Sequence, residues 1–412
     1  MSKKVVLVWF RNDLRLHDNE VLSEAINKSD LIIPVYCFDP RYFTKDQFQH
    51  YRTGIKRGKF LLESVSYIKE QLQAMNSDLM VFVGKPEDLL PQLCSKYEVD
   101  EVYHHREVAS RETQISESVE SALWKNKINL RHFIGHTLYH KEDLPFPIKD
   151  IPDKFNIFRK KVEKESTVRP SISAPISIPS PQHLEETHLP SLEDLGYSSE
   201  DIEKWGSKEF EGGERFGIKK LKKLLDPNYT GNENFTLISP YIAIGSLSPI
   251  YVYHEMNTSN LSQNKKRFER LTSMLLWRDY FRFMLKKYPN VFFKLNGLDS
   301  EHLNPEHIED GAVINWEKGT TGDQEIDDNI RTLIETGNIT YAERRLLSKY
   351  FTQETGSNWL FGASFFEEHL LDFAPATTYG FWSHMAGVGT SQKENSCSDW
   401  QELAKRLLVS KS

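Results

Sequence analysis

The sequence predicts an α/β domain, then a long connector, then a larger all-α domain, and three observations lead to this fold class. Short apolar runs alternate with amphipathic stretches over roughly the first 135 residues. Prolines then become frequent, with eight of the chain's 18 lying between Pro145 and Pro190. Residues 200–412 carry apolar side chains at helical spacing. We therefore place the domains at residues 1–140, 141–199 and 200–412.

In the first domain, the alternation favours a parallel sheet with helices on both faces, which is a Rossmann-like arrangement. Amphipathic stretches such as Phe60–Met75 separate the predicted strands. No G-x-G-x-x-G motif follows the first strand, so we do not expect the sheet to hold the main cofactor as a dinucleotide-binding domain does. The predicted strands are Val5–Phe10, Leu31–Phe38, Leu79–Val83, Val102–His104 and Leu130–Ile134.

The proline-rich stretch is typical of a connector that wraps the surface, because proline removes a backbone donor and fixes φ. Beyond it the spacing of apolar residues predicts helices over Gln263–Lys287, Gln324–Thr336 and Ala342–Gln353. The predicted architecture is thus an N-terminal parallel α/β domain joined by this connector to a C-terminal helical domain.

Composition narrows the class of protein and its partners. The three cysteines are too few and too scattered to predict a disulfide framework or a metal site. No signal peptide or membrane-spanning run is present, so we expect a cytoplasmic protein without a membrane partner. The net charge of −7 limits any nucleic-acid contact to local basic clusters, each of which fits a solvated helix face equally well. These clusters are Lys219, Lys220, Lys222 and Lys223; Lys265, Lys266 and Arg267; and Lys286 and Lys287.

Two arginines lie on apolar helix stripes. Arg278 shares its stripe with Leu275 and Phe281, and Arg344 shares one with Leu347. A buried cation without a partner is costly, so each arginine needs a carboxylate or a bound phosphate unless it leaves the helix edge for solvent.

Motifs at both ends of the chain point to a known family. They are the opening segment Leu7–Asn19 and three tryptophan-containing motifs at Trp316–Gly322, Asn358–Ala363 and Thr378–Trp382. With them the chain resembles the photolyase/cryptochrome family, and within it the cryptochrome DASH branch, as a divergent member with a short C-terminus. The resemblance implies a helical FAD-binding domain in which Trp316, Trp359 and Trp382 relay electrons to a buried flavin after blue-light absorption. All three also fit a role as ordinary core residues.

The resemblance also implies a set of FAD contacts. The segment Phe235, Thr236, Leu237, Ile238 and Ser239 is similar to the loop that holds the FAD phosphates, with Phe235 and Leu237 in place of a hydroxyl and a basic residue. Arg278 falls in a flavin-pocket motif of the family. Asp372 is the family's partner for Arg344 beside the flavin ring. Ala374 and Thr378 replace an aspartate and an asparagine that face the ring.

Substrate and antenna contacts follow from the same resemblance. Met274 replaces a glutamate that contacts the DNA lesion, Trp277 is expected to stack on flipped bases, and Tyr341 with Ala342 replaces an Asn-Arg pair. Glu107 matches a position that contacts an antenna pigment such as 5,10-methenyltetrahydrofolate, although a surface salt bridge explains it as well.

Two functions remain open at this point. The first is light-driven repair of cyclobutane pyrimidine dimers in single-stranded DNA by a DASH-type deoxyribodipyrimidine photolyase, a carbon–carbon lyase. The second is a non-catalytic cryptochrome-like photoreceptor or nucleic-acid-binding relative that has lost repair. For either function we expect a monomer with modest affinity for single-stranded or damaged DNA.

Overall fold

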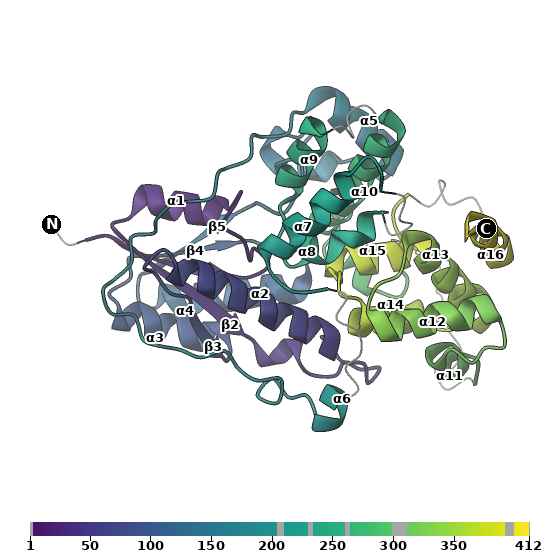
Figure 1. Cartoon of the computed structure of the whole chain (residues 1–412), viewed down its shortest axis with the longest axis horizontal. Helices are drawn as coiled ribbons and strands as arrows, with labels where there is room; N and C mark the ends of the chain where they lie inside the picture. Colours follow the sequence, from purple (N-terminus) through teal and green to yellow (C-terminus); the bar gives the residue numbers. More distant parts are fainter. Residues whose placement is uncertain are drawn as a thin grey trace.

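The computed structural model of the protein describes residues 3–203, 210–229, 234–259, 264–298, 311–391 and 399–411. The sheet and its helices form one end of the molecule, and a group of helices forms the other (Figure 1). The described helices include none that is long and apolar enough to cross a bilayer.

The α/β domain is built on one five-stranded sheet in the order β3-β2-β1-β4-β5, and every neighbouring pair is parallel. This confirms the predicted parallel sheet. The first two strands begin and end at the predicted residues, and the other three differ by one residue at one or both ends. The strands are β1 Val5–Phe10, β2 Leu31–Phe38, β3 Met80–Val83, β4 Glu101–His105 and β5 Asn129–Phe133.

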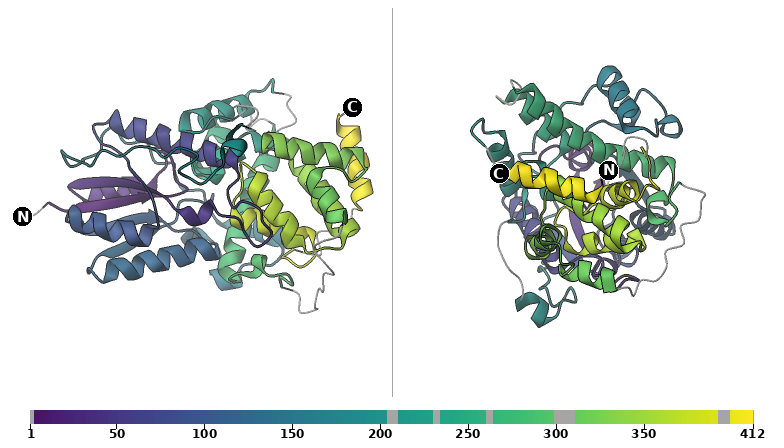
Figure 2. Two further views of the ribbon diagram at one scale, coloured as in Figure 1. Left: turned by 90° about the horizontal axis from the view of Figure 1, so that it is seen from below. Right: turned by 90° about the vertical axis from the view of Figure 1, so that its right-hand side faces the viewer.

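Helices cover both faces of the sheet (Figure 2). Side chains alternate along a strand, so Val6 and Val8 pack on the side of α1 and α2 while Leu7 and Trp9 pack on the side of α3 and α4. Burial on both faces explains why the strands read as continuous apolar runs. These helices are α1 Glu20–Lys28, α2 Ile55–Gln73, α3 Pro86–Lys96 and α4 Ser110–Trp124.

The region expected to be connector contains a helix that the sequence analysis missed, α5 (Phe155–Glu165). It buries Phe155, Phe158 and Val162 and packs on α10 of the helical domain. The i, i+3, i+7 spacing of these residues was visible in the sequence, but the surrounding prolines outweighed it. A short helix, α6 (Ser199–Glu203), ends the connector.

The second domain is helical, as predicted. Its helix α12 has the predicted bounds, and α10 begins after residues 260–263, which lie outside the described part of the chain. Helix α13 ends at Tyr350 and passes into one turn of π-helix, Phe351–Thr355. The helices are α7 Glu214–Leu225, α8 Ser239–Ala243, α9 Pro249–Thr258, α10 Lys265–Lys287, α11 Gly311–Lys318, α12 Gln324–Thr336, α13 Tyr341–Tyr350, α14 Trp359–His369, α15 Pro375–Met385 and α16 Trp400–Lys411.

A buried arginine ties the two domains together. Arg15 is fully buried and donates to the carbonyl oxygens of Asp18, Gly135 and Gly245, the last of which belongs to the helical domain. Gly245 has φ +74°, and a Cβ there would meet the carbonyl oxygen of Asn12. Glycine is therefore required where the loops of the two domains meet.

Candidate functional site

A cavity opens in the helical domain, with about 910 Å³ of empty space that includes open solvent at its mouth. Residues at the start of α8 and on α10, α13 and α15 form most of its wall, which brings together positions spread over about 150 residues of sequence. Of the residues singled out from the sequence, it is lined by Phe235, Thr236, Ser239, Met274, Trp277, Arg278, Tyr341, Arg344, Asp372, Ala374 and Thr378.

An ion pair with a hydroxyl partner lies in this wall. Arg344 Nη2 is 2.9 Å from Asp372 Oδ2, and Ser239 Oγ donates to the same oxygen at 2.5 Å. The Arg344 Nε donates to the carbonyl oxygen of Ile339 at 3.1 Å, which fixes the plane of the guanidinium. The predicted pair is therefore present, and its role beside a flavin stays a prediction.

Two buried oxygens of the wall have no hydrogen-bond partner among the described residues, Asp372 Oδ1 and Thr377 Oγ1. A buried polar atom left without a partner costs about 1–3 kcal/mol, so such atoms are rare unless a ligand satisfies them. This is the pattern expected of a wall that binds a polar ring system. Thr378, which was assigned from the sequence, also lines the cavity, whereas Thr377 was missed because nothing in the sequence shows that both neighbouring threonines reach it.

Arg278 is buried and does not reach solvent at the helix edge, and its hydrogen-bond partner is not a carboxylate. It donates to the carbonyl oxygen of His136, which belongs to the α/β side of the molecule. Burial, reinforced by the neighbouring Arg282, lowers the pKa of Arg278 to about 10. The residue lines both this cavity and a second one between the domains.

Much of the remaining wall is apolar. Met274, Phe281, Phe366 and Phe381 line it together with Ala374. Leu237 and Ile238 are buried in the core and do not line the cavity, so a ligand could meet only their backbone. The residues present fit FAD chemically, because the Arg344–Asp372 pair and the unpaired Asp372 and Thr377 oxygens can contact a polar ligand.

Trp277 already stacks on another side chain of the protein. Phe155 of α5 stacks on it with 3.8 Å between ring centroids and 13° between planes. His384 lies at 5.7 Å in a tilted arrangement. The connector helix therefore covers one face of the indole, and Phe281 also contacts the ring, at 5.3 Å between centroids.

The three predicted relay tryptophans lie in the helical core. Trp316 and Trp382 are in ring contact at 6.2 Å, and Phe351 contacts both, at 4.7 and 5.8 Å. Trp359 donates from Nε1 to the carbonyl oxygen of Leu295 at 2.8 Å. All three are buried, with exposed fractions of 0, 2 and 0% for Trp316, Trp359 and Trp382. The structure thus joins two of the three by ring contact, and their relay role stays a prediction.

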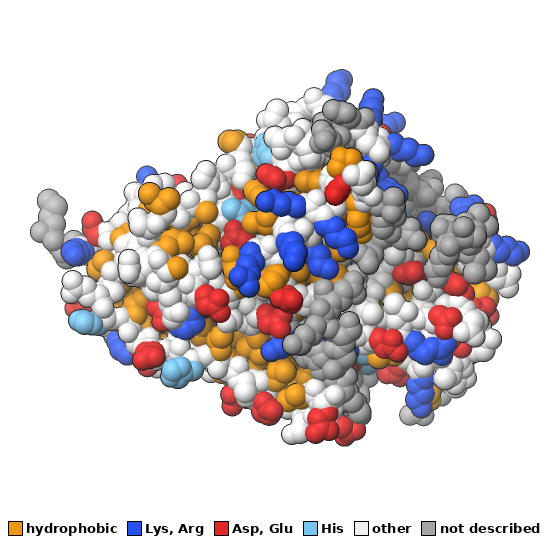
Figure 3. All heavy atoms as spheres, in the orientation of Figure 1, with side chains coloured by type: hydrophobic (Ala, Val, Ile, Leu, Met, Phe, Trp, Pro, Cys, Tyr) orange, Lys and Arg blue, Asp and Glu red, His pale blue; other side chains and the backbone are white. Residues whose placement is uncertain are grey.

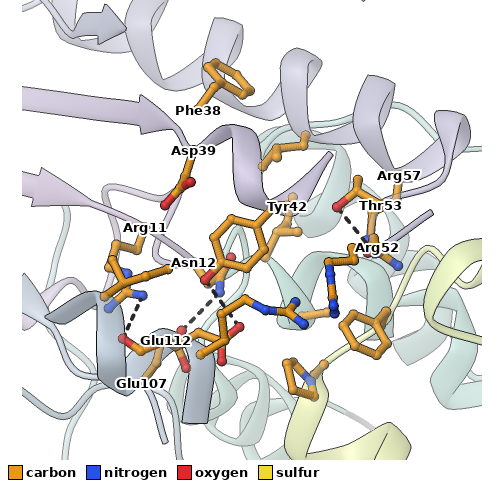
Figure 4. A pocket seen from close by; sticks show the side chains of 18 of the residues that line it. Arg11, Asn12, Phe38, Asp39, Tyr42, Arg52, Thr53, Arg57, Glu107 and Glu112 are labelled. Atoms are coloured by element: carbon orange, nitrogen blue, oxygen red, sulfur yellow. Dashed lines mark hydrogen bonds between the residues drawn. The ribbon is translucent and has the colours of Figure 1, made fainter. Parts of the chain in front are cut away.

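A second cavity, of about 1140 Å³, forms a crevice between the domains (Figure 4). Residues just past the carboxyl ends of β1 and β2 line it, including Arg11, Asn12 and Asp39. In open parallel sheets, ligands commonly bind outside the carboxyl ends of the strands, where the strand order reverses. That reversal lies between β1 and β4 in this sheet.

Glu107 lies in this crevice and does not form a surface salt bridge. Its carboxylate accepts from Asn12 Nδ2 at 3.0 Å and from Arg282 Nη2 at 3.1 Å, and His136 Nε2 is 3.5 Å away. Burial opposes ionisation of Glu107, but Arg282 and Arg11 outweigh burial and hold its pKa below the usual value. The carboxylate is therefore a fixed negative charge of the interdomain contact.

Comparison with known proteins agrees with the fold and with the motifs. Residues 6–180 match the family described as DNA photolyase, and residues 271–402 match the FAD binding domain of DNA photolyase. The chain is 36% identical over 407 residues to the cryptochrome DASH of Gloeobacter violaceus, covering 95% of this chain and 81% of that one. It is also 36% identical to the cryptochrome DASH of Danio rerio, covering 96% of this chain and 79% of that one.

Solved structures give the same result. The crystal structure of a Synechocystis cryptochrome superposes with a TM-score of 0.87 at 32% identity, covering 98% of this chain and 87% of that one. A class III photolyase from Agrobacterium tumefaciens shares the fold, with a TM-score of 0.82 at 21% identity over 99% of this chain and 87% of that one. The chain therefore belongs to the photolyase/cryptochrome family, carries that family's helical FAD-binding domain, and is DASH-type by homology.

Proposed function

We propose that the protein is a blue-light-absorbing flavoprotein that repairs cyclobutane pyrimidine dimers in single-stranded DNA by light-driven electron transfer. The observation that carries this proposal is the cavity of the helical domain, where the Arg344–Asp372 pair stands beside two buried oxygens that need a ligand. The tryptophans packed behind the cavity support the same function, because indole is oxidised more readily than other core side chains.

Non-covalent FAD is the cofactor that this site supports. Bound FAD supplies the absorption of blue light and the electron that is transferred. Asp372 and Arg344 would hold a fixed charge pair beside the bound cofactor, and Thr377 and Thr378 would offer hydroxyls to it. Thr236 lies in the turn before α8 and lines the cavity, where its hydroxyl can meet a phosphate oxygen. Ser239 begins α8 and donates its hydroxyl to Asp372.

DNA binding on this proposal is modest and depends on salt. A lesion must leave the base stack to reach the cavity, and a single strand lowers that cost. Trp277 and the partly exposed ring of Tyr341 line the cavity, where aromatic rings can stack on bases. Basic side chains gather on the face shown in Figure 3, where α7 carries Lys219, Lys222 and Lys223, all exposed. The cluster at Lys286 and Lys287 is less available, because Lys287 pairs with Asp153 at 2.7 Å and burial lowers the pKa of Lys286 to about 8.

A non-catalytic photoreceptor or nucleic-acid-binding relative is the second candidate, and the wall of the cavity favours it. The Met274 thioether cannot accept strong hydrogen bonds from base edges. Ala342 is exposed beside Tyr341 and offers no guanidinium for a phosphate. Phe155 covers one face of Trp277. In this second candidate function, the protein retains the flavin site and has lost the site for the DNA lesion.

The interdomain crevice is the place for an antenna pigment, which we propose to be a folate such as 5,10-methenyltetrahydrofolate. Its wall combines aromatic side chains with several arginines (Figure 4), which suits a planar ligand with carboxylates. Glu107 already accepts hydrogen bonds from Arg282 and Asn12. A ring N–H of the pigment would therefore have to donate to a carboxylate lone pair that these two donors leave free.

One set of measurements tests the proposal. FAD is titrated into the protein, and a thymine-dimer oligonucleotide is then repaired under blue light by the wild type and by Met274→Glu/Ala342→Arg. We expect saturable FAD binding, slow repair by the wild type and faster repair by the double variant. Ser118→Arg adds a positive charge on the exposed face of α4 and is the matched control for the arginine. No repair by either protein with FAD bound and reduced would establish the non-catalytic candidate.

A further inference from the structure

Under the proposed function Trp277 is a platform on which DNA bases stack, and the role inferred here for its neighbour Phe155 rests on that function. Trp277 lies on α10, is half-buried and lines the cavity, so part of its ring still meets the cavity. Such a platform binds best when its ring is already held in place, because immobilising a free side chain on binding costs affinity. The contacts that fix the plane of the indole therefore decide how well it can stack.

Four aromatic rings of the described residues contact the Trp277 indole, and one of them lies parallel to it. Phe155 stacks on the indole with 3.8 Å between centroids and 13° between planes, the shortest centroid distance of any aromatic pair in the described part of the chain. The other three rings are tilted or edge-on at 5.3–5.7 Å, and they belong to Tyr280, Phe281 and His384. A parallel ring in van der Waals contact prevents the indole from tilting, so Phe155 is the neighbour that fixes its plane.

The connector segment that carries Phe155 is fastened to α10 just before α5 begins. The Asp153 carboxylate accepts from Lys287 Nζ at 2.7 Å and from Tyr288 Oη at 3.0 Å. The Asp153 carbonyl oxygen accepts from the Tyr280 hydroxyl. These donors belong to α10 and its C-cap, so the phenyl ring is held against the same helix that carries the indole.

A second set of hydrogen bonds joins the connector to the segment that follows α15. Ser391 Oγ accepts from the Phe155 N–H at 3.0 Å, and the Ser391 N–H donates to the Asp153 carbonyl oxygen at 2.9 Å. Ser391 has φ +63°, in the left-handed region that non-glycine residues seldom occupy, so this backbone geometry is adopted at a cost. The buried Phe155 is therefore fixed both from α10 and from the end of α15, and both helices contribute to the cavity wall.

We propose that Phe155 is a positioning residue, which holds the Trp277 indole in the orientation that stacks on a DNA base in the cavity. The connector then serves recognition of the lesion as well as joining the two domains. Stacking between two aromatic rings contributes a factor of about two to ten to an equilibrium constant. Loss of the phenyl ring should weaken binding of a flipped base by about that factor. Phe155 does not itself line the cavity, so FAD affinity should not change.

The test compares Phe155→Leu with the wild type, with Phe155→Tyr, which keeps a ring, and with Phe158→Leu. Phe158 is fully buried in the same helix and contacts Tyr280, so its replacement loosens α5 without removing the ring that stacks on Trp277. Each protein is loaded with FAD, and its affinity is measured for single-stranded oligonucleotides with and without a thymine dimer. Fluorine NMR of protein labelled with 5-fluorotryptophan reports on the indole itself, and Trp277→Phe assigns its signal.

We expect Phe155→Leu to lose about twofold to tenfold in its preference for the dimer over the undamaged strand, and to shift the Trp277 signal. In the repair assay this variant should raise KM and leave kcat unchanged, because the ring acts on binding of the lesion. Phe155→Tyr and Phe158→Leu should keep the wild-type preference. If Phe155→Leu does not fold, Ser391→Ala removes only the hydroxyl that holds Phe155 and should lose preference in the same direction.

Two results would overturn the positioning role alone. One is a wild-type preference for the dimer that Phe155→Leu retains, and the other is an equal loss in Phe155→Leu and Phe158→Leu. Absence of any preference for the dimer in the FAD-loaded wild type would instead overturn the proposed repair function, and the positioning role with it.

Discussion

The two cavities of this molecule differ in whether their buried side-chain oxygens all have partners. In the interdomain crevice every lining carboxylate has a partner from the chain itself. Glu107 pairs with Arg282 at 3.1 Å, Asp39 with Arg41 at 2.6 Å, and Glu367 accepts from Tyr379 at 2.6 Å. Glu112 accepts from Tyr42 at 3.3 Å. In the helical cavity the single ion pair leaves Asp372 Oδ1 and Thr377 Oγ1 without a partner among the described residues.

From this difference we infer that the helical cavity depends more on a ligand than the crevice does, where His136 Nε2 is the buried lining atom without a hydrogen-bond partner among the described residues. A wall whose charges are paired is stable whether or not a ligand is present, whereas buried oxygens without partners carry a free-energy cost that binding removes. We therefore expect FAD to stabilise the helical domain and a crevice ligand to change the stability of the protein much less. The predictions below test that contrast.

The largest effect is expected from Asp372→Ala. Removing this carboxylate leaves the Arg344 guanidinium, 15% exposed, with only the Ile339 carbonyl, and it frees Ser239. Loss of one partner of a buried pair costs about 3–5 kcal/mol, so we expect a fall of that order in the free energy of unfolding and loss of FAD binding. Urea unfolding and FAD titration measure both. Asp328→Ala, which breaks the exposed Arg331 pair, is the control and should cost under about 1 kcal/mol.

Asp279 makes the free energy of unfolding depend on pH. It lies on α10, where that helix meets Leu138 and Tyr139. Burial raises its pKa to about 7, although Arg278 and the backbone N–H groups of Tyr139 and Leu138 oppose the shift. The folded protein therefore binds the proton more tightly than the unfolded chain. The resulting stabilisation is present below pH 3.8, the unfolded value, and is lost as the pH rises through about 7.

Asp279→Asn should flatten this dependence, which amounts to about 4 kcal/mol at most between acidic pH and pH 8. Urea unfolding of both proteins at pH 5 and pH 8 is the measurement. Equal loss of stability on raising the pH in the variant and the wild type would show that Asp279 is ionised in the folded state at both values.

Glu107→Gln tests the crevice. Glutamine keeps the shape of the side chain but removes the charge that pairs with Arg282, and hydrogen bonds to charged groups contribute about 1.5–3 kcal/mol. We expect the free energy of unfolding to fall by that amount while the affinity for FAD is unchanged. A drop in FAD affinity as large as that of Asp372→Ala would contradict the separation of the two cavities.

The smallest effect is expected from Thr378→Asn. The longer amide can reach a ring atom that the threonine hydroxyl does not, and one neutral hydrogen bond contributes about 0.5–1.5 kcal/mol, or roughly twofold to tenfold in affinity. FAD titration of the variant and of Thr332→Asn, a substitution on the exposed face of α12, gives the comparison. Equal affinities would mean that residue 378 does not face the ring.

Local patterns in the sequence were sufficient for the elements and for part of the site. Continuous apolar runs gave β1 and β2 with their observed bounds, and three- and four-residue spacing gave α12. Such periodicities reflect the geometry of single strands and helices, so they can be read without knowing the neighbours. The helix stripes of Arg278 and Arg344 also predicted that each arginine either has an anionic partner inside the protein or leaves the helix edge for solvent. The pairing of Arg344 with Asp372 came from the family resemblance.

Only the tertiary structure decided which partners those side chains meet. The sequence did not show that Arg278 donates to a carbonyl of the other domain, that Phe155 covers Trp277, or that Glu107 is buried with Arg282. Nor did it show that all three tryptophans of the predicted relay are buried. Each of these contacts joins residues far apart in the chain, so it depends on how whole helices and loops pack, and no local periodicity contains that information.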